Sequence, residues 1–274
     1  MLSNALSWTK ELYEKHTFKI NMAVGLSLST FTLAIGALYH YQDQFIFFPQ
    51  FPSREHVWQP IEFDLKSHQL HLPLDNSTTQ YIHGWKIHPP TENGNDRKTN
   101  ILFFHGNAGN ISHRLPLIKL LYGSGKFDNV NFILIDYSGY GASSGQDVSE
   151  STIKQSVHAT MRYLKENNTN VVVFGRSLGG YAAIYAAVEY PEIVKALIVE
   201  NTFTSIDDMM ATLFGRWSVM MGGSLLIRSH LNNAALIGQV KQPTLFISGR
   251  QDQLVPPIQM DQIYQLRSSS SSSS

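Results

Sequence analysis

Short runs of apolar residues recur from residue 100 onward, separated by longer segments with the pattern of helices. A strand that is apolar at every position is buried on both faces, as in a parallel sheet covered by helices. Helical segments between such strands fit right-handed crossover connections. The pattern predicts an α/β fold with a mostly parallel sheet and helices on both faces. The runs are Ile101–Phe104, Asn131–Ile135, Val171–Phe174, Ala196–Val199 and Thr244–Ile247.

Helix boundaries can also be placed in this part of the chain. One helix begins near Asp147–Glu150, which resembles a capping box, and runs to about Lys165. Another follows Ser177 and stops before Pro191. Further helical stretches in residues 205–240 predict a small cap. Before residue 100 the expected strands are Ile61–Leu65 and Tyr81–Ile87.

An uncharged apolar segment, Ile20–Tyr39, lies near the N-terminus. Twenty helical residues rise about 30 Å, which matches the hydrocarbon core of a bilayer. Lysines precede the segment, and basic residues stay preferentially on the cytoplasmic side. We therefore expect a single-pass signal anchor with a cytoplasmic N-terminus and a luminal or extracellular body. A cleaved signal peptide or a buried amphipathic helix are the alternatives.

These segments give the predicted domain organisation. Residues 1–19 form a cytoplasmic segment, 20–40 the anchor and 41–267 the α/β domain. Residues 268–274 are all serine and form a low-complexity tail with nothing to bury. An aromatic–proline patch, Phe45–Pro52, follows the anchor directly, either at the lipid headgroups or packed under the domain.

The composition of the chain argues against several classes of function. Lys+Arg and Asp+Glu are 21 each, so no charge excess points to nucleic acid. The chain has no cysteine, which excludes disulfides, thiolate metal sites and cysteine nucleophiles. His68 and His71 are the nearest approach to a metal-ligand spacing, and they fit an exposed polar stretch better. No metal or cofactor is expected.

The sharpest chemical motif is Gly175-Arg176-Ser177-Leu178-Gly179. It stands between a predicted strand and a predicted helix of small residues. This order is typical of a nucleophile elbow, in which the serine occupies a strained turn and the glycines let strand and helix pass closely. Ser177 is the candidate nucleophile, and a chance motif in a loop is the alternative.

Two backbone N–H groups are the candidate oxyanion donors. One belongs to Leu178, directly after the nucleophile, and the other to Asn107, in the loop after the first apolar run. Glycines in that loop let the backbone turn its N–H groups toward a developing negative charge. His105 in the same loop is a possible base, but we interpret it as structural.

The candidate acid is Asp252, in the turn after the last apolar run. An aspartate there would hold a catalytic histidine in the correct tautomer and stabilise its imidazolium form. The alternative is a turn aspartate that caps the next helix. Glu200 is the second candidate acid, and Asp136 is interpreted as a turn residue.

Five motifs occur in one order along the chain, and together they resemble the membrane-anchored bud-emergence hydrolases of the α/β-hydrolase superfamily. The resemblance implies a single-pass membrane protein with a Ser–Asp–His triad, in which Ser177 is the nucleophile and Asp252 the acid. The motifs are His105–Asn110, Asp136–Gly145, Gly175–Gly180, Glu200–Phe203 and Ser248–Pro257.

The resemblance fails at the C-terminus. The family places its histidine after the acid, in a loop that follows one more strand. Gln253–Ser274 contains no histidine and no further strand-like run. His230 precedes Asp252, where the chain order of this fold does not place the base. We expect a truncated domain that lacks its final strand and helix.

The predicted function is a membrane-anchored serine hydrolase that cleaves ester, thioester or amide bonds through an acyl-enzyme on Ser177. Its substrate would be a small molecule or a lipid-like acyl compound. Because a serine hydroxyl is a poor nucleophile without a base, impaired activity is expected. The alternative is a catalytically inactive, membrane-tethered protein that keeps the fold for binding or as a scaffold.

Overall fold

The computed structural model describes residues 2–52, 54, 57–74, 79–90, 99–215 and 227–271. These residues belong to two compact units, Met1–Gln42 and Asp43–Ser274. Part of the predicted cap, residues 216–226, lies outside the described residues.

The first unit consists of most of helix α1 (Leu2–Ile46). Within the described part of the chain, Lys15–Ile46 is the one segment long and apolar enough to span a membrane, and its most apolar stretch is unburied. The hydroxyls of Ser29 and Thr32 each donate to the carbonyl four residues earlier, at 2.8 Å. Such bonds give these polar groups partners inside the helix, which an apolar surrounding requires.

The second unit contains a seven-stranded sheet in the order β1-β2-β4-β3-β5-β6-β7. β2 runs antiparallel to both β1 and β4, whereas the pairs from β4 to β7 are all parallel. The predicted apolar runs lie in β3 to β7, so the predicted mostly parallel sheet is confirmed. The strands are β1 (Lys66–Pro73), β2 (Tyr81–His88), β3 (Thr99–Phe104), β4 (Val130–Ile135), β5 (Val171–Arg176), β6 (Val194–Glu200) and β7 (Thr244–Ile247).

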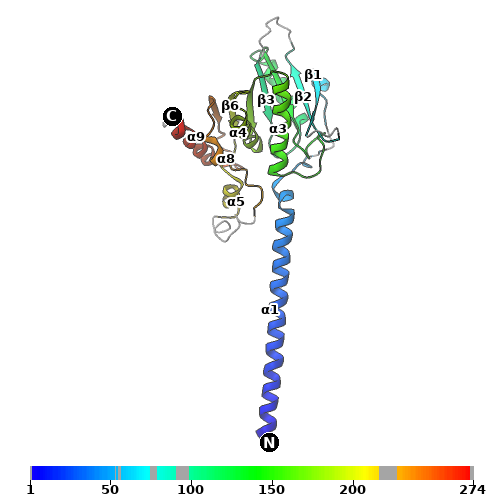
Figure 1. The fold of residues 1–274 in the computed structure, drawn as a ribbon, viewed down its shortest axis with the longest axis vertical. Helices are drawn as coiled ribbons and strands as arrows, with labels where there is room; N and C mark the ends of the chain where they lie inside the picture. The colour runs from blue at the N-terminus through cyan, green and yellow to red at the C-terminus, as the bar shows by residue number, and fades with distance from the viewer. Residues whose placement is uncertain are drawn as a thin grey trace. The chain divides into compact units, whose positions relative to one another are not determined.

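Helices cover both faces of this sheet, with α3 crossing it in Figure 1. Successive side chains of a strand point to opposite faces. In β3, Leu102 and Phe104 join a core with α3 and α4, whereas Ile101 and Phe103 face α2. The helices are η2 (Ile111–Arg114), α2 (Leu115–Gly123), α3 (Glu150–Glu166), α4 (Leu178–Glu189), α5 (Ile206–Phe214), α8 (Asn233–Ile237) and α9 (Pro257–Ser271).

The helix boundaries follow local chemistry. Helix α3 begins at Glu150, where the sequence predicts a helix start, but its capping box is formed by Ser149 and Thr152 and not by Asp147 and Glu150. The Ser149 hydroxyl accepts the Thr152 N–H, and Thr152 Oγ1 accepts the Ser149 N–H. Helix α4 ends at Glu189, before Pro191, as predicted. Helix α9 continues to Ser271, so the first residues of the predicted serine tail are helical.

The predicted strand Ile61–Leu65 is wrong. Pro60–Phe63 form a 3-10 helix (η1), and Asp64 adopts a left-handed conformation with φ 57°. Proline suits the first turn of a helix because its missing N–H has no partner there. The apolar residues of this stretch therefore lie in a helical turn and not in a strand. Strand β1 begins only at Lys66.

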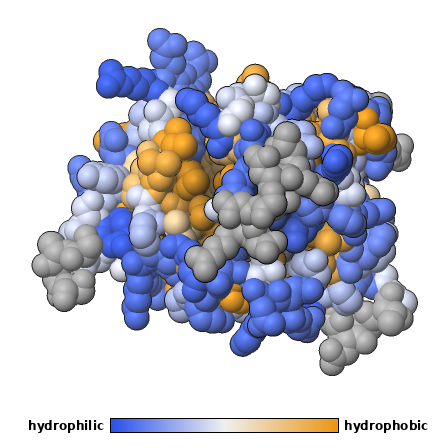
Figure 2. Space-filling view, turned by 90° about the horizontal axis from the view of Figure 1, so that it is seen from above, coloured by the Kyte–Doolittle hydropathy of each residue, from blue (hydrophilic) through white to orange (hydrophobic). Residues whose placement is uncertain are grey.

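One edge of the sheet is open among the described residues. β7 pairs with β6 alone, and its Leu245 and Ile247 are exposed. An edge strand of this kind offers N–H and C=O groups to another strand. Elsewhere, the face drawn in Figure 2 is mostly hydrophilic, with hydrophobic side chains gathered in a few local patches.

Candidate active site

Ser177 occupies the turn between β5 and α4 with φ 53° and ψ −118°. For a residue with a side chain, this conformation is strained by about 1–3 kcal/mol. In a nucleophile elbow such strain turns the serine hydroxyl outward at the carboxyl ends of the strands. The structure therefore gives Ser177 the backbone geometry that this motif needs.

The two glycines of the motif let three backbone segments touch. A Cβ on Gly179 would overlap the carbonyl oxygen of Phe104 at the end of β3. A Cβ on Gly175 would overlap the carbonyl oxygen of Gly179. Strand β5, helix α4 and the end of β3 therefore meet at backbone distance, as the motif predicts.

Backbone contacts also fasten Ser177 to the end of β6. Its N–H donates to the Glu200 carbonyl at 2.9 Å, and its carbonyl accepts the Thr202 hydroxyl at 2.8 Å. These bonds fix the elbow against a segment distant in sequence. This role of Thr202 is not predicted from the sequence, although Thr202 belongs to Glu200–Phe203, one of the five motifs that carry the family resemblance.

The candidate oxyanion donors lie around this turn. Leu178 is the first residue of α4, so its N–H has no acceptor within the helix. The loop after β3 lies directly beside the elbow, because a Cβ on Gly106 would stand 3.5 Å from Ser177 Cβ. Asn107, half-buried, follows in the same loop. The structure thus brings the loop and the elbow together.

His105 is fully buried beneath this loop. Burial is the main reason that the pKa of His105 is lowered to about 4, with the Asp136 carboxylate opposing the shift. The neutral ring donates from Nδ1 to the Gly106 carbonyl at 2.7 Å. Asp136, also buried, accepts the Ile111 N–H at 2.9 Å. This geometry favours the structural interpretation of His105.

Asp252 lies in the turn between β7 and α9. Its Oδ1 accepts the N–H groups of Leu254 and Val255, both at 2.9 Å. Its Oδ2 has no hydrogen bond within the described residues. Oδ1 thus closes the turn before α9 (Pro257–Ser271) and, in the described contacts, caps no N–H of that helix, although the alternative interpretation would require such a cap. Oδ2 remains able to accept a hydrogen bond from a histidine.

The second candidate acid, Glu200, is half-buried and lies 3.9 Å from Arg176, measured from Oε1 to Nε. The carboxylate of Glu200 thus faces Arg176, a residue of the elbow motif itself. Asp252, whose Oδ2 accepts no hydrogen bond within the described residues, therefore remains the first candidate acid.

The His230 ring donates a hydrogen bond to Asp207, with 2.8 Å between Nδ1 and Oδ2. His230 precedes Asp252, where the chain order of the fold does not place the base, and no local pattern in the sequence points to Asp207 as its partner. The pair lies where α5 begins, since the Ile206 N–H donates to the His230 carbonyl. Within the described contacts, no hydrogen bond joins the pair to Ser177.

The carboxylate of Glu150, the first residue of α3, gathers several donors. Its Oε1 accepts the Tyr181 hydroxyl at 2.6 Å, and its Oε2 accepts the N–H groups of His230 and Leu231. Burial raises the pKa of Glu150, but these bonds and Lys154 outweigh it and hold the pKa below its ordinary value. The carboxylate therefore connects helices α3 and α4 to the backbone of His230 and Leu231, which belong to the predicted cap region and precede α8.

The change Glu150→Gln is expected to lower the free energy of unfolding at pH 7 by roughly 1–2 kcal/mol, because charged hydrogen bonds weaken. A lowered pKa stabilises the fold above the unfolded value, near 4.5, and this stabilisation is lost as pH falls through the folded value. The difference between Glu150→Gln and wild type should therefore shrink below pH 4.5 in urea unfolding of the full chain. A difference that grows on acidification would contradict this.

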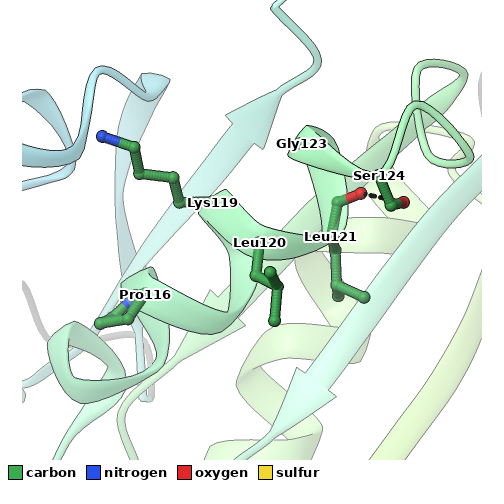
Figure 3. A pocket seen from close by; sticks show the side chains of 6 residues that line it. All are labelled: Pro116, Lys119, Leu120, Leu121, Gly123 and Ser124. Carbon is green, nitrogen blue, oxygen red and sulfur yellow. Dashed lines mark hydrogen bonds between the residues drawn. The ribbon is translucent and has the colours of Figure 1, made fainter.

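The histidines of β1 and a pocket along α2 both lie outside the candidate site. His68 and His71 point to opposite faces of the strand, and His68 instead bonds His88 across the hairpin at 2.7 Å. No group of three possible metal ligands occurs in the described ranges. A shallow pocket lies along α2, with the side chains of Lys119 and Leu120 at its rim (Figure 3), apart from the elbow, loop and acid turn.

Comparison with known proteins agrees with this geometry. The family described as "Serine aminopeptidase, S33" matches residues 95–241. Protein bem46 of Schizosaccharomyces pombe is 36% identical, over 85% of this chain and 77% of its own length. The "Uncharacterized membrane protein YNL320W" of Saccharomyces cerevisiae is 29% identical, over 89% of this chain and 84% of its own length.

A solved structure shares the fold. The esterase Pf2001 of Pyrococcus furiosus superposes with a TM-score of 0.60 at 18% identity, covering 78% of this chain and 82% of the esterase. The family match spans more than half of the chain, and the bem46 match confirms the predicted resemblance to bud-emergence hydrolases. The chain therefore belongs to the S33 family of α/β-hydrolases, within the serine hydrolase superfamily.

Proposed function

We propose that this protein is a membrane-anchored serine hydrolase that cleaves ester, thioester or amide bonds, with Ser177 as its nucleophile. The observation that carries the proposal is the strained backbone of Ser177 between β5 and α4. Such strain costs free energy and clusters at sites where a side chain must be held in position for chemistry.

The reaction follows from the groups around the turn. Ser177 Oγ loses its proton to a base and bonds to the substrate carbonyl carbon. The Leu178 and Asn107 N–H groups hold the resulting oxyanion. Collapse of this tetrahedral intermediate breaks the bond to the alcohol, thiol or amine. The leaving group takes a proton from the base, and the acyl group stays on Ser177 as an acyl-enzyme. Water then releases the acid and restores the serine, the same base moves the protons of both steps, and Asp252 would orient that base.

The base is the part of the machinery that the proposal does not name. Gln253–Ser274 contains no histidine. His105 is buried and hydrogen-bonded within its loop, and His230 is paired with Asp207. The named residues thus supply the nucleophile, the acid and the oxyanion donors.

Imidazole should therefore restore hydrolysis by the chain of residues 1–274. We expect slow cleavage of a nitrophenyl ester by the full chain in detergent micelles, with a rate that rises with added imidazole after subtraction of the imidazole reaction itself. Imidazole can take the proton of Ser177 as a histidine would. The matched control is Ser177→Ala, which should show no increase. Equal rates for the two chains would contradict the proposal and favour a binding or scaffold role.

Helix α1 is proposed to be the anchor. Its Lys15–Ile46 segment has the length and composition of a membrane span, and a yeast relative is named a membrane protein. Lysines before the apolar stretch favour a cytoplasmic N-terminus. The α/β domain would then face the lumen or the exterior.

A further inference from the structure

The residues that follow the anchor helix are bonded to the candidate oxyanion loop. We define the juxtamembrane strip as Ile46–Phe51 and the oxyanion loop as His105–Asn110. A parallel bridge pairs Phe48 with Ala108, and the Gly109 N–H donates to the Phe51 carbonyl at 2.6 Å. The strip thus runs alongside the loop that supplies one of the two oxyanion donors.

The side chain of Asn107 closes this connection. Its Nδ2 donates to the Ile46 carbonyl at 2.7 Å, and its Oδ1 accepts the Phe48 N–H at 3.1 Å. The Tyr140 hydroxyl donates to the same oxygen at 2.8 Å. The amide thus binds the strip on both sides, so a displacement of the strip would move Asn107.

The phenylalanines of this region divide into buried and exposed side chains. Phe47 is 2% exposed and packs in the core, which holds the strip in place. Phe45, Phe48 and Phe51 are 66%, 48% and 68% exposed. Large apolar side chains that cluster on a surface mark an interaction site. The strip therefore combines a fixed backbone with an exposed aromatic surface.

The small number of residues between the candidate span and the strip indicates that lipid covers this surface. The candidate span ends at Ile46, so Phe48 is two residues beyond it, or at most about 7 Å of extended chain. Phe51 is five residues beyond, at most about 18 Å. If the uncharged segment Ile20–Tyr39 fills the hydrocarbon core, the seven helical residues that follow rise about 10 Å, so Ile46 lies at the outer side of the headgroup layer. The side chains of Phe48 and Phe51 are therefore within reach of the lipid headgroups.

We infer that the juxtamembrane strip docks on the lipid surface and holds the oxyanion loop there, so that the substrate is a long-chain acyl ester or thioester resident in the membrane. This inference rests on the proposed hydrolase function and anchor. An acyl carbonyl at headgroup depth would reach the loop without leaving the bilayer. Soluble esters would lack the contribution of the strip.

The docking can be tested without any catalysis, because the chain contains no cysteine. Phe48→Cys and Phe51→Cys would each carry a nitroxide label in full-length protein in phosphatidylcholine vesicles. Lys126→Cys, at an exposed position between α2 and β4, is the matched control. Electron paramagnetic resonance then measures relaxation by oxygen, which concentrates in lipid, and by a water-soluble nickel complex.

We expect oxygen to relax the labels at 48 and 51 more strongly than nickel does, and the reverse at 126. Labels at 48 and 51 that behave like the control would overturn the inference. Protection from both agents would place protein over the strip, such as a second copy, and would also overturn it.

The substrate class is tested by a ratio of rates. The double variant Phe48→Ser, Phe51→Ser should lower the ratio of long-chain ester hydrolysis in vesicles to soluble acetate-ester hydrolysis by roughly 10-fold or more, because apolar contact with lipid is lost. An unchanged ratio would overturn the substrate assignment. If wild type hydrolyses neither ester, even with imidazole, the proposed hydrolase fails, while the nitroxide measurement still decides the docking.

Discussion

Replacing Ser177 with glycine is expected to raise the free energy of unfolding by about 1 kcal/mol while it abolishes acylation. Glycine adopts φ 53° and ψ −118° without the clash of a Cβ atom, which relieves about 1–3 kcal/mol of strain. The greater flexibility of glycine in the unfolded chain offsets part of this gain, by roughly 0.5–1 kcal/mol. The Ser177 side chain caps no N–H group of α4, so no such bond is lost.

The matched control is Ser177→Ala, which also lacks the hydroxyl but keeps the strain. Urea unfolding of both full-length variants in micelles, followed by tryptophan fluorescence, gives the comparison. Both should lose acylation, and only the glycine variant should gain stability. A glycine variant that is less stable than the alanine variant would show that the turn is not strained.

Replacing Gly179 with valine is expected to prevent folding of the α/β domain. Its Cβ would overlap the carbonyl oxygens of Phe104 and His105, which are backbone atoms that cannot move without disturbing β3 and the oxyanion loop. Overpacking ordinarily costs about 1–3 kcal/mol. Because the overlapped atoms here are backbone on two sides, we expect Gly179→Val to reach the exceptional range above about 4 kcal/mol. Limited proteolysis of the full chain measures the effect, and the domain should be degraded rapidly.

Gly238→Val provides the control for this change. A Cβ on Gly238 would make only ordinary contact with Ser270, at 3.8 Å, and the residue is helical with φ −64°. This variant should resist protease nearly as well as wild type. Equal resistance of the two valine variants would contradict the close approach of β3 and α4.

The sheet could be predicted because its strands are apolar at successive positions and end in small or polar residues. The elbow could be predicted because Gly175 and Gly179 flank Ser177 at fixed spacing. Both signals are local, and the structure reproduces them in β5 and α4. The prediction of a strand at Ile61–Leu65 was wrong because a 3-10 turn that starts at Pro60 accommodates the same apolar residues.

The contacts around the candidate site could not be predicted, since they join residues far apart in sequence. Asn107 bonds Ile46 across 61 positions, and Thr202 bonds Ser177 across 25. The pairing of His230 with Asp207 likewise depends on the fold of the cap. Asparagine, threonine and histidine are common in loops, so their roles become visible only when the strands bring these loops together.

The central claim, that Ser177 is the nucleophile, is tested most directly by mass spectrometry after reaction with a fluorophosphonate. The full chain in vesicles is treated with the probe in the presence of imidazole, digested, and searched for the modified serine. We expect one adduct, on Ser177, and none on the Ser177→Ala chain. An adduct on a different serine, or labelling that persists in Ser177→Ala, would contradict it.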